Sequence, residues 1–112
     1  MRFAKSVERL TVEQRLHFYE VLAHNLTVAV RGIWSDPGLE DAEKVERMKW
    51  VNEVMHRVTA KVYVVRLKTH EWSETDFEDM LLGYIQSYPG IASEIGGAVR
   101  HSYRIVTGEE MG

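Results

Sequence analysis

The sequence predicts an all-α protein, an antiparallel bundle of four main helices built as a single domain over residues 1–112. Apolar residues recur at steps of three and four along most of the chain, which is the spacing of one helical face. Both prolines, Pro37 and Pro89, are followed by glycine and punctuate this pattern as turns do. A chain of this length buries enough surface for a core without disulfides, and it contains no cysteine.

Residues 11–34 are the most apolar stretch and are predicted to form the central helix. Thr11 can cap its start, with Gln14 completing a capping box. One apolar stripe comprises Val12, Leu16, Tyr19, Ala23, Leu26, Val30 and Ile33. Further apolar residues lie off that stripe, namely Phe18, Val21, Leu22, Val28 and Ala29. A helix that is apolar nearly all round needs neighbours on several sides. We therefore expect a homodimer built largely on this helix.

The neighbouring segments suggest a hairpin. Before the central helix, Phe3, Val7 and Leu10 have the spacing of a short N-terminal helix. After it, a turn at residues 35–38 returns the chain antiparallel into a second long helix, from about residue 40 to 68. Its inward stripe comprises Val45, Met48, Val51, Met55, Val58, Val62 and Val65. Residues 58–67 are rich in β-branched side chains and could form a strand, but the unbroken helical spacing favours a helix.

Two shorter helices complete the predicted bundle. Ser73 can cap the third, with Asp76 three residues later, and Pro89 ends it. Its inward residues are Phe77, Leu81, Tyr84 and Tyr88. The fourth is predicted over residues 91–106, with Ile95, Ala98, Val99, Ser102 and Val106 inward. Gly96 and Gly97 either allow close helix contact or mark a break in this helix.

Composition narrows the functional classes. Without cysteine there is no thiolate metal site, and no apolar run is long enough for a membrane span or a signal-peptide core. We expect a cytoplasmic protein without a cofactor. The net charge of −3 makes nucleic acid an improbable partner. Arg57, Lys61 and Lys68 are nevertheless predicted to share one basic face of the second long helix.

The polar flank of the central helix suggests a possible metal site. His17, Glu20 and His24 follow one another at helical steps, and the next helix carries Glu53-x-x-His56. This step occurs in di-iron carboxylate bundles, which also need inward ligands from two further helices. Those ligands are missing from the pattern, so no metal is predicted and a metal-binding bundle is the third interpretation.

The stretch LAHNLTVAVRGIWSDPGLEDAEKVERMKWVNEVMHRV lies within residues 12–68. It resembles the dimerisation and phosphoacceptor hairpin of sensor histidine kinases and related phosphotransferases, in which two hairpins form a four-helix dimer. The resemblance implies that His24 accepts the phosphoryl group and that Asn25 positions it. It also implies phosphotransfer without autokinase activity, because no nucleotide-binding domain is recognised. Thr27, Val28 and Ala29 stand where that family has an arginine and a polar-proline pair.

The favoured interpretation is a small non-enzymatic regulatory or adaptor protein. It would act through protein contacts, as a homodimer and with an unidentified protein. The predicted interaction residues are Phe18, Val21, Leu22, Val28 and Trp50. The alternative is a histidine phosphotransfer protein that uses His24. Under the favoured interpretation, we expect His24 to be buried and to remain unphosphorylated.

Overall fold

The computed structural model describes residues 2–68 and 72–111, and every regular element in them is helical. The all-α prediction is confirmed. The elements are α1 (Ala4–Glu8), α2 (Val12–Trp34), α3 (Asp41–Arg66), α4 (Glu74–Ser87), the short 3₁₀ turn η1 (Pro89–Ile91) and α5 (Ala92–Thr107). The predicted N-terminal helix is therefore present as α1.

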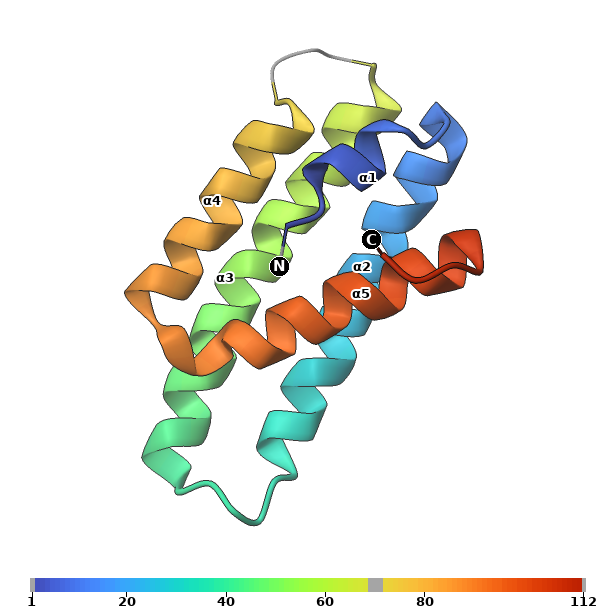
Figure 1. Cartoon of the computed structure of the whole chain (residues 1–112). Helices are drawn as coiled ribbons and strands as arrows, with labels where there is room; N and C mark the ends of the chain where they lie inside the picture. Colours follow the sequence, from blue (N-terminus) through green and yellow to red (C-terminus); the bar gives the residue numbers. More distant parts are fainter. Residues whose placement is uncertain (1, 69–71, 112) are drawn as a thin grey trace.

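The long antiparallel hairpin of α2 and α3 is the frame of the molecule (Figure 1). Its start is fixed by the predicted capping box: the Gln14 amide donates to the Thr11 hydroxyl, and the Thr11 amide donates to the Gln14 side chain, each over 3.1 Å. At the connecting turn, the Gly38 amide donates to the Asp36 carboxylate over 2.8 Å. Because α3 stays helical to Arg66, the helical prediction for residues 58–67 is correct and the strand alternative is wrong.

The other helices pack on this hairpin, with α4 beside α3 and α5 crossing α2 (Figure 1). Ser73 caps α4 as predicted, accepting the Asp76 amide over 3.1 Å. Helix α5 runs unbroken through Gly96 and Gly97. A Cβ at Gly97 would meet nothing within 4 Å, and one at Gly96 would meet only the Arg100 side chain of the same helix. The two glycines therefore neither break α5 nor allow another helix to approach closely.

Buried aromatic side chains gather where α1, α2 and α4 meet. Aromatic rings from these segments form a chain of contacts, with centroids 6.0 Å apart for Phe3 and Phe18, 5.1 Å for Phe18 and Tyr19, and 5.4 Å for Tyr19 and Phe77. Two residues predicted to face inward, Val12 and Val45, are instead 49% and 57% exposed. Val12 is the first residue of α2 and Val45 is the fifth residue of α3, so each lies near an end of the hairpin.

Much of the apolar circumference of α2 is covered by other helices of the same chain, since Phe18 and Leu22 are buried. The surface of the molecule is 6639 Å², close to the roughly 6,300 Å² expected of a monomer of this mass. Val28 of the same helix stays 50% exposed, so apolar surface of α2 remains uncovered there.

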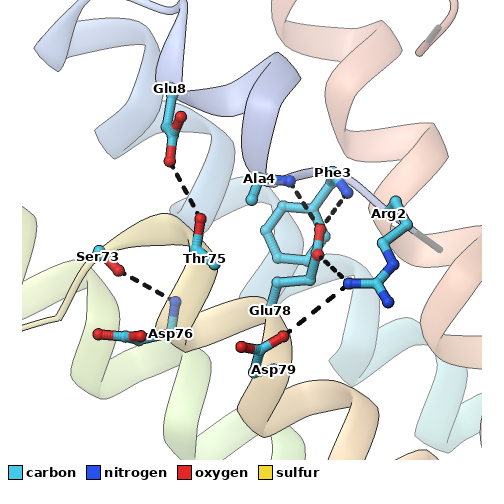
Figure 2. Close-up of polar contacts among 9 residues, drawn as sticks. All are labelled: Arg2, Phe3, Ala4, Glu8, Ser73, Thr75, Asp76, Glu78 and Asp79. Carbon is cyan, nitrogen blue, oxygen red and sulfur yellow. Dashed lines mark hydrogen bonds and ion pairs between the residues drawn. The ribbon is translucent and has the colours of Figure 1, made fainter.

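Helix α1 is held on α4 by one buried carboxylate, that of Glu78 (Figure 2). It accepts the backbone amides of Phe3 and Ala4 over 2.5 and 2.8 Å, and the Arg2 guanidinium over 3.1 Å. Burial alone would raise the pKa of Glu78, but these donors together outweigh burial and lower it. The carboxylate therefore stays ionised and satisfies backbone donors at the start of a helix that lacks its own side-chain cap.

Candidate functional sites

A shallow groove of about 470 Å³ runs between α2 and α5 around the predicted phosphoacceptor. It is lined by His17, Glu20, Val21, His24, Asn25 and Ile105. The Asn25 amide donates to the Ser102 hydroxyl over 2.9 Å, and that hydroxyl donates to the Ala98 carbonyl over 2.6 Å. These two hydrogen bonds connect α5 to α2 directly beside His24.

His24 itself is exposed, so the expectation that the chain buries it is wrong. Among the described residues its ring makes no hydrogen bond and no ion pair. The exposed Glu20, one turn earlier, is paired with Arg66 of α3 over 3.1 Å. The groove therefore presents a free imidazole next to an amide that is held in place, on a face open to solvent.

The predicted interaction residues divide into three groups. Phe18 and Leu22 are 0% and 1% exposed in the core, so their assignment to a partner surface was wrong. Trp50 is half-buried and stacks on Tyr88, the residue that follows α4, at 6.0 Å between ring centroids. Val21 and Val28 lie on the outer face of α2, half-buried and 50% exposed respectively. Val21 and Val28 keep apolar surface for a partner on the groove side of α2.

The predicted basic face does not exist as one surface. The Arg57 guanidinium donates to the Tyr84 hydroxyl over 3.1 Å, and Lys68 lies beyond the end of α3. Lys61 is only 2% exposed. It lies three residues after Val58 and four before Val65, both buried, so it belongs to the inward side of α3.

The possible metal ligands of α2 and α3 do not come together. Within residues 2–68 and 72–111, no three potential ligands from His, Cys, Asp and Glu lie together. Glu53 and His56 are both exposed. In the same part of the chain, none of the helices combines the length and the apolar character that a membrane span requires.

A buried charge cluster, not predicted from the sequence, joins α2, α3 and the start of α4. The ammonium of Lys61 lies 3.2 Å from the Glu74 carboxylate and donates to the Trp72 carbonyl. The Arg15 guanidinium approaches the same Glu74 oxygen at 3.5 Å. The side chains of Lys61 and Glu74 are 3% and 7% exposed, and the Tyr19 ring lies 5.4 Å from the Lys61 nitrogen.

Burial shapes the electrostatics of this cluster. Desolvation lowers the pKa of Lys61, and the neighbouring Glu74 carboxylate only partly compensates. Burial also raises the pKa of Tyr19, and the Glu74 charge raises it further, so the hydroxyl remains protonated. Among the described residues, the Tyr19 hydroxyl, Arg15 Nε and Glu74 Oε1 all lack a hydrogen bond. A buried group left without any partner costs about 1–3 kcal/mol, whereas Glu74 Oε1 still has the Lys61 and Arg15 cations beside it.

The cluster lines a cavity of about 480 Å³. Arg15, Lys61 and Glu74 share it with Val12, Val64, Val65, Lys68, Trp72 and Ser73. Sequence reasoning missed this site because its three charged residues come from three helices whose packing no local pattern specifies. One signal was present: Lys61 interrupts an apolar stripe at a position where a lysine needs a partner.

The chain matches none of the protein families, curated proteins or solved structures with which it was compared. Function is therefore inferred from the geometry of the α2–α5 groove and of the cavity.

Proposed function

We propose that the protein is a cytoplasmic, non-enzymatic regulatory or adaptor protein that works through protein–protein contacts as a homodimer, with the α2–α5 groove as the subunit contact. The observation that supports this proposal most is a pair of half-exposed aliphatic side chains on the two helices of the groove. Ile105 lines the groove from α5, and Val28 lies one turn beyond His24 on α2, each 50% exposed.

The groove has the composition of a self-complementary contact. Val21 and Ile105 supply an apolar centre, while His17 and Glu20 supply a polar edge. In a two-fold dimer the same surface of each subunit meets its own copy. An apolar side chain of one subunit can then enter the groove of the other, and the symmetry repeats this contact a second time. An apolar centre within a polar rim is the usual anatomy of protein interfaces.

The proposed dimer is one of folded, separable protomers. Each chain already buries its core, and its surface area is that of a monomer. Such an interface typically removes about 800 Å² from each partner and dissociates on dilution. We therefore expect the average mass to shift from two chains towards one as the protein is diluted.

Light scattering after size exclusion, over a dilution series, tests the homodimer. Val28→Glu combined with Ile105→Glu should give one chain at every concentration, because each change puts charge into the apolar contact. Trp34→Glu is the matched control, since Trp34 is 64% exposed at the hairpin end, away from the groove. Wild type that has the mass of one chain throughout would remove the dimer from the account.

The second candidate is histidine phosphotransfer, and the exposure of His24 is the observation that favours it. A phosphoacceptor histidine needs an accessible, neutral ring nitrogen. Asn25, oriented by Ser102, lies beside it. Incubation with phosphoramidate should then give an acid-labile phosphate that is lost in His24→Ala and kept in His17→Ala, which changes the same groove. The absence of label from wild type would eliminate this candidate.

A further inference from the structure

We propose that the cavity between α2, α3 and the start of α4 binds a small organic monoanion, a carboxylate that carries an apolar group. The proposal is independent of the homodimer, because none of the residues lining this cavity lines the α2–α5 groove. Four observations support it: the charge balance, the unused donors, the apolar wall and the backbone of Lys68.

Among the described residues that line the cavity, cations outnumber carboxylates. Arg15 and Lys61 bring two cations, and Glu74 brings one carboxylate at 3.5 and 3.2 Å from them. Lys68, exposed and also lining the cavity, adds a third cation. The single charge of Glu74 can balance only one of these three cations, so the others would attract a bound anion. A monoanion would come closer to balance than a dianion, which the Glu74 carboxylate would repel more strongly.

The cavity also holds hydrogen-bonding capacity that the described residues leave unused. Arg15 Nε is buried without a hydrogen bond, although the rest of its guanidinium approaches Glu74. A guanidinium is planar and carries donors in a fixed fork that matches a carboxylate. Glu74 Oε1 is an acceptor that already has two cations near it. The Arg15 guanidinium is therefore positioned by the fold and incompletely satisfied by it.

The remaining wall selects the rest of the ligand. Val12, Val64, Val65 and Trp72 face the same space as the charged groups. A bare inorganic anion would leave this apolar surface in contact with water, whereas an alkyl or aryl group would cover it. The volume of about 480 Å³ lies within the range of small-molecule sites, roughly 300–1,000 Å³. Val12, 49% exposed, would lose apolar exposure on binding.

The backbone of Lys68 adds an independent indication. Its φ of 56° places it in the left-handed region, which favours glycine just after a helix. Lysine at this position is strained, yet its side chain lines the cavity. Strain of this kind is concentrated at functional sites, where the side chain has a use that offsets its conformational cost.

Amide NMR titration of the full chain tests the site, with acetate, hexanoate, decanoate and benzoate as probes. Hexanamide and hexylammonium serve as neutral and cationic controls of matched length. We expect saturable shifts confined to the lining residues, with hexanoate or a larger carboxylate binding about tenfold or more tightly than hexanamide, because a charge-assisted pair is lost in the amide. Hexylammonium should bind weakest.

Arg15→Gln should weaken the best carboxylate by about tenfold or more, by removal of its guanidinium. Lys68→Gln, at an exposed position, keeps the test available if Arg15→Gln does not fold. Arg57→Gln, a cation of α3 that does not line the cavity, should leave binding unchanged. The proposal is overturned if no carboxylate gives saturable shifts, if hexanamide or hexylammonium binds as tightly, or if Arg57→Gln weakens binding as much as the cavity variants.

Discussion

Two buried carboxylates, those of Glu74 and Glu78, lie one turn apart on α4 and differ in how well hydrogen bonds satisfy them. Glu78 accepts three hydrogen bonds from residues 2–4, with both of its oxygens in use. Glu74 has two cations at 3.2 and 3.5 Å, but the oxygen nearest to them has no hydrogen bond among the described residues. Both residues are almost fully buried, with Glu74 5% and Glu78 3% exposed.

The difference separates a structural carboxylate from one in a candidate site. The donors around Glu78 are matched to its acceptors, so the chain itself completes the arrangement and α1 is fixed as a result. Around Glu74, positive charge and donors exceed what the carboxylate satisfies. Only the surroundings of Glu74 therefore leave positive charge and hydrogen-bond donors for a ligand.

The largest expected effect is the loss of Glu74. Glu74→Met leaves the buried Lys61 ammonium without its carboxylate and with the partly exposed Arg15 guanidinium nearby, and it should lower the free energy of unfolding by about 3–5 kcal/mol. Adding Lys61→Met to that variant should recover most of the loss, because a buried pair replaced as a whole by apolar residues is often close to neutral. Urea denaturation of the three proteins measures both values. If the two substitutions destabilise additively, the cluster is not a coupled pair.

Loss of the other carboxylate should cost less. Glu78→Ala leaves the Phe3 and Ala4 amides without their acceptor and should lower the free energy of unfolding by about 2–3 kcal/mol. Hydrogen exchange should also accelerate first in α1. Asp79→Ala is the control, because Asp79 is exposed and its carboxylate comes no closer than 4.0 Å to the Arg2 guanidinium. It should change the free energy of unfolding by less than about 0.5 kcal/mol. Similar losses in both variants would mean that docking of α1 does not depend on Glu78.

Acid should selectively weaken the Glu78 contact. The pKa of Glu78 is lowered from its ordinary value of 4.5, because its backbone and Arg2 donors outweigh burial. Its stabilising contribution is therefore complete above about pH 4.5 and is lost as the pH falls through the lower folded value. The free energy of unfolding, measured between neutral pH and pH 3, should fall less steeply in Glu78→Gln than in wild type. Parallel slopes would contradict this assignment.

The smallest effect expected is a gain in stability. Lys68→Gly removes the strain of a left-handed lysine and should raise the free energy of unfolding by about 0.5–1 kcal/mol. The same change removes a cation from the cavity. Thermal melting shows the gain, and Lys68→Ala, which keeps the strain without the charge, separates backbone from side chain. A glycine variant that is less stable than wild type would show that the lysine side chain itself stabilises the fold.

The fold was largely predictable because its signals are local. The Thr11 capping box, the Ser73 cap and Pro89 place helix boundaries through contacts only a few residues long, and the helical spacing of Phe77 and Leu81 identifies an inward face. These features depend on neighbouring positions, which a sequence displays directly.

The candidate site was hidden because its geometry is not local. Lys61 and Glu74 meet only after α3 and α4 have packed, and Arg15 reaches them from α2. Treating Lys61 as part of a basic surface followed from its charge and overlooked its register among valines. The assignment of Phe18 and Leu22 to a dimer contact failed for a related reason, because the periodicity of α2 cannot tell cover by its own chain from cover by a partner.

The docking of α1 also bears on how the chain is made. Ala4 leaves the ribosome long before its acceptor, since Glu78 follows 74 residues later. At typical synthesis rates that interval is roughly 4–15 s. The α2–α3 hairpin is complete earlier, as its two helices are joined by a short turn. Until α4 is synthesised, Phe3, which is buried in the finished protein, lacks its contact with Phe77. A segment that is synthesised early is thus among the last to be seated, and chaperones can bind its apolar side chains in the meantime.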